Sequence, residues 1–235
     1  MRVTANVQQR LRLPESDRGA PARRFGAIRL VVAILIVASI ATQVVQESIY
    51  NDFMPLEYFS YFTVQSSLID VVILTLSGLM AALWKRESTL LGVLRVSVVS
   101  YAIVTAVVYN VWLRALPDDG YVVSQWPNEI IHVAVPLFLL VDWLVAPGRP
   151  VLRVRDVRIV LIFPLVWLAF TFVRGTLDGW FPYPFLLRGR PDSWFAAGAY
   201  VLGISAFIVT VTLMLIALSR ARWANTDRLW GVQGR

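Results

Sequence analysis

The sequence predicts an all-α integral membrane protein, a bundle of six transmembrane helices whose N- and C-termini both lie in the cytoplasm. Three observations support this prediction. Hydrophobic residues make up 57% of the 235-residue chain and charged residues only 16%, which is too apolar for a soluble domain of this length. Apolar runs long enough to cross a bilayer recur along the chain, and positive charges are concentrated in alternate connections between them.

Each predicted helix is an apolar run close to the ~20 residues that cross the hydrocarbon core. The runs cover residues 27–46, 60–84, 92–113, 129–146, 157–174 and 195–218. They form one transmembrane domain, residues 25–220, without an internal repeat. Residues 1–24 are rich in arginine and include two prolines, so we expect a disordered, basic cytoplasmic tail. Residues 221–235 are expected to form a second cytoplasmic tail.

The distribution of basic residues predicts the orientation of the bundle. Of the 22 lysines and arginines, 18 fall on one side of the membrane, a count that includes Arg29 and Arg95. The other side holds four: Arg114, Arg174, Arg188 and Arg190. Basic residues stay in the cytoplasm, so both termini are predicted there, and the plasma membrane is the expected location.

Composition also excludes several classes of function. The absence of cysteine rules out disulfides, thiol catalysis and zinc–thiolate sites, and one histidine cannot supply a pair of axial haem ligands. A net charge of +7 would indicate nucleic-acid binding in a soluble protein, but here the arginines lie beside apolar spans. We therefore expect no metal, no cofactor and no nucleic-acid partner, only membrane lipids and a lipid-like small molecule.

Polar residues form a stripe on the second predicted span. Thr63, Ser66, Ser67 and Asp70 share one face at 3.6 residues per turn. A single serine or threonine in a span usually bonds the carbonyl one turn back, which accounts for any one hydroxyl but not for the carboxylate. A carboxylate inside a span needs a partner or a water-filled cavity, so the stripe is predicted to face the bundle interior.

The only histidine of the chain, His132, lies at the start of the fourth span, one turn after Asn128. An ionisable side chain at such a position is by default a candidate functional group, and histidine transfers protons near neutral pH. A hydroxyl beside an imidazole is the minimal nucleophile–base pair, and a third group often orients the base. We expect Thr63 to approach His132, with Asn128, Asp70 or Glu129 as the orienting group. The alternative is a structural histidine bonded to a hydroxyl across helices.

A third polar and aromatic cluster follows the fifth span. Proline and aromatic residues make this connection rigid, which suits either a lid over the bundle or an interfacial anchor. The candidates for substrate contact are Trp180, Tyr183, Phe185 and the preceding Arg174. Arg174 is a candidate to bind a substrate carboxylate, or alternatively to pair with Asp178.

Three segments together resemble the androgen-induced protein family, which includes the androgen-dependent regulator of tissue-factor-pathway inhibitor and bacterial six-helix relatives. They are Tyr61-Phe62-Thr63, then Asn128-x-x-x-His132 followed by Pro136, then Trp180-Phe181-Pro182-Tyr183-Pro184-Phe185-Leu186. The resemblance extends over about residues 27–218. Characterised animal members are threonine hydrolases of fatty-acid esters of hydroxy fatty acids. The resemblance implies that Thr63 is the nucleophile and His132 the base.

These observations lead to one leading hypothesis and two alternatives. The leading hypothesis is a multipass membrane hydrolase that cleaves an ester of a lipid-like substrate entering from the bilayer. The first alternative is a proton-coupled carrier that uses Asp70 and His132 as a relay. The second is a structural or regulatory membrane protein without small-molecule chemistry.

Overall fold

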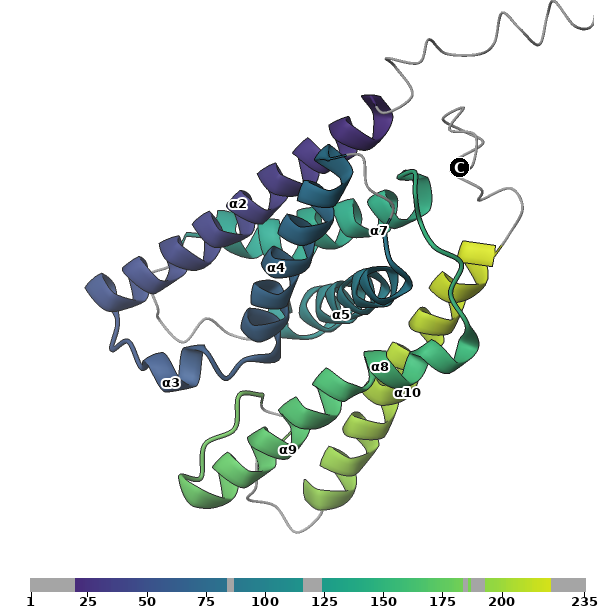
Figure 1. Ribbon diagram of the computed structural model, residues 1–235. Helices are drawn as coiled ribbons and strands as arrows, with labels where there is room; N and C mark the ends of the chain where they lie inside the picture. The colour runs from purple at the N-terminus through teal and green to yellow at the C-terminus, as the bar shows by residue number, and fades with distance from the viewer. Residues whose placement is uncertain (1–19, 84–86, 116–123, 184–185, 187–192, 221–235) are drawn as a thin grey trace, which may run out of the picture.

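The structure is a computed structural model that describes residues 20–83, 87–115, 124–183, 186 and 193–220. Every regular element in these ranges is a helix (Figure 1). The helices form six segments long and apolar enough to cross a membrane. The prediction of an all-α bundle with six spans is therefore confirmed, whereas the cytoplasmic location of the termini stays a prediction.

Three of the six segments consist of more than one element. In chain order the elements are α2 (Ala20–Tyr50), α3 (Pro55–Tyr58), α4 (Phe62–Ala82), α5 (Thr89–Val111), η2 (Leu113–Ala115), α6 (Trp126–Glu129), η3 (Ile130–Ala134), α7 (Val135–Val145), η4 (Val154–Asp156), α8 (Val157–Val160), α9 (Ile162–Leu177) and α10 (Ser193–Arg220). The element η3 is a π-helix, and it continues α6 into α7 without a break.

The first helix begins earlier than predicted. Because α2 starts at Ala20, residues 20–24 are helical and do not belong to a disordered tail. Pro21 is compatible with this start, because N–H groups in the first turn of a helix have no acceptor within the helix and the missing N–H of proline costs no hydrogen bond. The rest of the predicted N-terminal tail, and the predicted tail 221–235, lie outside the described residues.

The most deeply buried of the six spans is α5, which separates two groups of helices (Figure 1). On one side α2 packs on α4 and α7, and α4 and α7 in turn pack on α5. On the other side α8 and α10 contact α5, and α9 continues from α8. The ends of α2 and α4 that flank α3 lie at one end of the molecule, called here the α3 end (Figure 1).

Small residues allow α2 and α4 to approach closely. A Cβ atom added at Gly26 would lie 2.6 Å from the carbonyl oxygen of Gly78. A Cβ atom at Gly78 would lie 3.0 Å from the carbonyl oxygen of Gly26. Because membrane helices gain stability from close backbone packing rather than from the hydrophobic effect, these two glycines fix the α2–α4 contact.

Two prolines in the spans leave carbonyl groups that α5 satisfies with side chains. Pro136 has no N–H for the carbonyl of His132, and the Asn110 side chain donates to that oxygen at 3.1 Å. Pro164 likewise has no N–H to donate to the carbonyl of Val160. The Tyr101 hydroxyl donates to that carbonyl oxygen at 2.5 Å. In a membrane interior such carbonyls need a protein partner, so these bonds fix α5 against both neighbouring spans.

Candidate functional site

A cavity of about 80 Å³ lies toward the α3 end, between α4, α5, α9 and α10. Most of its lining is aliphatic or aromatic, with Val104, Leu168 and Ile204 as examples. Its polar groups come from four side chains on different elements: Thr63, Thr105, Tyr183 and Ser205. The cavity is thus apolar with a few hydroxyl-bearing side chains in its wall.

Thr63 is the second residue of α4, and it lines the cavity together with Tyr183. Burial raises the pKa of Tyr183 to about 12, and the contacts with Thr63 act in the opposite direction. The Tyr183 ring lies edge-on to Tyr61 with centroids 5.7 Å apart and packs against Trp167 at 6.0 Å. The structure thus brings together two of the predicted site residues, Thr63 and Tyr183.

His132 is buried in the π-helical segment η3, and its ring is stacked on Tyr109 with centroids 3.8 Å apart. Its Nδ1 lies 3.1 Å from the main-chain carbonyl oxygen of Asn128. Because a carbonyl only accepts, Nδ1 carries the proton and a neutral imidazole keeps Nε2 free to accept one. The backbone carbonyl of Asn128 therefore fixes the orientation of the imidazole.

The Asn128 side chain has a different role. Its carbonyl oxygen accepts from the Gln43 amide at 2.9 Å, and Gln43 in turn accepts from the Tyr58 hydroxyl at 2.7 Å. Glu129, the other orienting candidate next to the histidine, forms an ion pair with Arg114 instead. These contacts connect α2, α3 and α6 at the α3 end.

No hydrogen bond joins Thr63 to His132 in the structure, although both residues are described. Thr63 lines the cavity together with Tyr183, whereas His132 lies against Tyr109 and is not among the residues that line the cavity. The expected direct approach is therefore not seen in this conformation. Hydrogen bonds of catalytic groups are often long before substrate binds.

The rest of the polar stripe on α4 is buried, as the sequence predicts. Ser66 donates to the carbonyl of Thr63 in its own helix at 3.1 Å, and Ser67 is buried beside it. Asp70 is only 3% exposed, and its Oδ1 has no hydrogen-bond partner among the described residues. No hydrogen bond or ion pair joins the carboxylate to His132, and no group of metal-binding side chains occurs in the described ranges.

Arg174 holds the connection after α9 in place. Its Nε donates to Asp178 at 2.8 Å, and its Nη1 donates to the Leu56 carbonyl at 2.9 Å and to the Ser60 hydroxyl at 2.5 Å. Its guanidinium carbon lies 4.4 Å from the centre of the Trp180 ring. Of the two roles left open by the sequence, the structure has the ion pair with Asp178. Phe185 lies outside the described residues.

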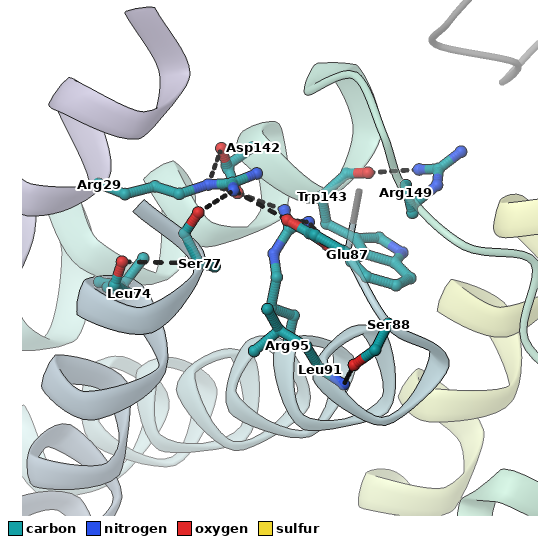
Figure 2. A network of polar contacts seen from close by, with 10 residues as sticks. All are labelled: Arg29, Leu74, Ser77, Glu87, Ser88, Leu91, Arg95, Asp142, Trp143 and Arg149. Atoms are coloured by element: carbon teal, nitrogen blue, oxygen red, sulfur yellow. Dashed lines mark hydrogen bonds and ion pairs between the residues drawn. The ribbon is translucent and has the colours of Figure 1, made fainter. Parts of the chain in front are cut away.

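Four buried charges form a cluster of ion pairs (Figure 2). Asp142 of α7 binds Arg29 of α2 at 3.1 Å and Arg95 of α5 at 2.5 Å. Glu87, just before α5, binds the same two arginines at 2.9 and 2.6 Å. Two cations and two anions balance, so the cluster holds three spans together without a net charge in the interior.

The sequence analysis missed this cluster, although a signal was present. Arg29 and Arg95 were counted among the charges that orient the helices, but both lie within predicted spans and are almost fully buried. Asp142 lies in an apolar run. Like Asp70, it is a carboxylate inside a predicted span and therefore needs a partner. Two arginines and an acid inside three different spans predict an interhelical ion pair.

No protein-family model, curated protein or solved structure matches the chain. The resemblance to the androgen-induced protein family accordingly stays an expectation based on three short motifs. The geometry of the site is the basis for the functional proposal.

Proposed function

We propose that this multipass membrane protein is a hydrolase that cleaves an ester bond in a lipid-like substrate, with Thr63 as the nucleophile and His132 as the base. The observation that supports it is the position of the Thr63 hydroxyl at the wall of an apolar cavity between spans. An acyl chain entering from the bilayer would occupy the cavity and place its ester carbonyl beside this hydroxyl. Nε2 of His132 is the available proton acceptor.

In the proposed reaction the Thr63 oxygen attacks the acyl carbonyl and its proton passes to His132. The tetrahedral intermediate then collapses, the bond to the alcohol breaks, and His132 returns the proton to the leaving alkoxide. Water releases the acyl group from Thr63 with the same base. Because no hydrogen bond connects the two side chains in the structure, the reaction requires the imidazole to approach Thr63 on substrate binding, or one water to bridge them.

Ester hydrolysis by purified protein tests this proposal. Thr63→Ala and His132→Ala should each reduce the rate on a medium-chain acyl ester by on the order of 10³-fold or more, and the double variant should be scarcely slower. The matched control is Thr210→Ala, because Thr210 lies in a span and bonds the carbonyl of Ala206 in its own helix at 2.8 Å. Mass spectrometry after fluorophosphonate treatment should locate the adduct on Thr63. Full activity of folded Thr63→Ala protein would disprove the proposal.

A second candidate function is supported by Asp70. A buried carboxylate with an unpartnered oxygen in a membrane span is a typical site for a transported proton. Under this alternative, Asp70→Asn abolishes proton-coupled uptake into proteoliposomes, whereas under the hydrolase proposal it leaves ester cleavage intact. Measuring both activities on the same preparation separates the two functions.

A further inference from the structure

The connection between α7 and α8 passes the end of α10 (Figure 1) and brings arginines from two parts of the chain together. Arg153, Arg155 and Arg158 lie in one short stretch of this connection and of α8, and all three are exposed. Arg220, the last residue of α10, is also exposed, and its Nε donates to the carbonyl oxygen of Leu152 at 2.7 Å. These four arginines are called here the basic patch.

Backbone oxygens, rather than carboxylates, hold two of these guanidinium groups. Besides the bond from Arg220 to Leu152, the Nε of Arg158 donates to the carbonyl oxygen of Arg155 at 3.2 Å. Because Nε is used in both cases, the Nη groups remain as donors toward a ligand. Two guanidinium groups are therefore oriented without loss of their positive charge.

No acidic side chain neutralises the basic patch within the described residues. Asp156 is the one acid between Asp142 and Asp178, and its Oδ2 accepts the backbone N–H of Arg153 at 2.7 Å. The ion pairs of the described ranges involve other arginines. The patch therefore carries an excess of positive charge that an anion can neutralise.

Exposed valines alternate with the arginines of this connection. Val151 is 67% exposed and Val154 is 56% exposed, whereas Leu152 between them is buried. The N–H of Leu152 donates to the Ser219 hydroxyl of α10 at 3.4 Å, so the segment is fixed with its valines outward. Apolar and basic side chains side by side are typical of a segment at the boundary between lipid headgroups and acyl chains. The adjoining spans place the segment at such a boundary.

We propose that the basic patch binds the phosphate of an anionic phospholipid, with Val151 and Val154 among its acyl chains. Guanidinium groups bind phosphate oxygens through pairs of N–H donors. A phospholipid supplies both the phosphate and the apolar chain, whereas a soluble anion supplies only the charge. The arginines would orient the spans in any arrangement, so orientation alone does not account for guanidinium groups fixed beside outward valines.

Lipid binding to the full-length protein in an uncharged detergent tests the inference. Mass spectrometry of the intact complex counts bound lipids during titration with phosphatidylglycerol or phosphatidylcholine. Phosphatidylglycerol should bind more tightly. The double variant Arg153→Gln/Arg155→Gln should weaken its binding by roughly fivefold for each arginine removed. Neither side chain makes a hydrogen bond in the described structure, so the fold of the connection is retained.

The matched control is Arg23→Gln/Arg24→Gln, which removes the same charge at exposed positions near the start of α2. It should leave phosphatidylglycerol binding unchanged. Equal loss in the two double variants, or equal affinity of the native protein for the two lipids, would overturn the inference. Inorganic phosphate at millimolar concentration should not displace the lipid, because it has no acyl chain. Displacement would identify a site for soluble anions and would overturn the assignment to a lipid.

A nitroxide label at Val154→Cys measures the depth of the valines, since the chain has no other cysteine. In vesicles that contain phosphatidylglycerol, the label should collide more often with oxygen, which concentrates in the bilayer, than with a water-soluble nickel chelate. Leu165→Cys, at an exposed position of α9, provides the reference for a label in lipid. A label at position 154 that collides mainly with the nickel chelate would place the segment in water and overturn the inference.

Discussion

His132 shows how single residues acquire a chemical state from their neighbours. The backbone carbonyl of Asn128 fixes the proton on Nδ1, and Tyr109 covers one face of the ring. Pro136 cannot donate to the His132 carbonyl, and Asn110 of α5 donates to it instead. The imidazole is thus held in one tautomer within a π-helical segment, a type of distortion that is frequent at functional sites.

Arg174 provides a test of single-residue function. Three of its interactions hold local structure, so Arg174→Ala should loosen the connection that includes Tyr183 and reduce hydrolysis by a similar factor for all esters. The measurement compares kcat/KM for two esters of equal length, with and without a free carboxylate. A loss confined to the carboxylate ester would instead show that Arg174 binds the substrate head group.

At the scale of helices, interhelical contacts are made by glycines and by buried charges. Gly26 and Gly78 permit close approach of α2 and α4, while the ion-pair cluster connects α2, α5 and α7 (Figure 2). Trp143 extends the cluster, because its ring lies 5.5 Å from the Arg95 guanidinium and its Nε1 donates to the Leu215 carbonyl of α10 at 3.2 Å. The same region therefore joins both groups of helices.

The glycine contact predicts opposite effects of one substitution at two positions. Gly26→Ala should destabilise the protein, because the new methyl group would meet backbone atoms of α4 that cannot move aside. At Gly203 of α10 nothing lies within 4 Å, so Gly203→Ala should be neutral or stabilise by up to about 1 kcal/mol through helix propensity. Unfolding in detergent micelles measures both. Equal effects would show that the α2–α4 approach is not close.

The charge cluster predicts a large effect for loss of one anion. Asp142→Asn leaves Arg29 and Arg95 with less compensation in a buried site, so we expect a loss of about 3–5 kcal/mol in the free energy of unfolding. Asp52→Asn, at an exposed position between α2 and α3, should change the free energy of unfolding by less than about 0.5 kcal/mol. A small effect at Asp142 in the same unfolding assay would mean that the cluster is hydrated and not truly buried.

The whole molecule places the candidate site and the charge cluster toward opposite ends of the bundle. Thr63, His132 and Tyr183 come from the part of each span near the α3 end, and Arg29, Glu87 and Asp142 come from the other part. Under the predicted topology, the site lies in the outer leaflet and the cluster in the inner leaflet.

Cysteine labelling measures this topology directly, because the chain has no cysteine of its own. A cysteine at position 52, on the α3 side, should react with an impermeant thiol reagent added to intact cells. A cysteine at position 153, in the connection before α8, should react only after the membrane is permeabilised. The reverse pattern would place the candidate site on the cytoplasmic side.

The sequence alone determined which segments are helical, how many are apolar enough to cross the membrane, and that Asp70 is buried. Length and hydropathy decide the first two, because a backbone in lipid must satisfy its own hydrogen bonds. Helical periodicity decides the third, since it gives the face of a helix on which a residue lies. The beginning of α2 was placed too late because the arginines before the apolar run do not prevent a helix from forming.

Only the tertiary structure decided which faces meet. Periodicity does not indicate the neighbour of each helix, so the sequence paired Thr63 with His132, while packing placed Thr63 with Tyr183 at the cavity. For the same reason the sequence did not show that Arg29 and Arg95 pair with Asp142, since the partners lie on different spans. Each arginine, taken alone, is as typical of the positive charges that orient a helix as of a buried ion pair. Contacts between spans depend on helix packing and on the folded connection after α9, neither of which a local pattern encodes.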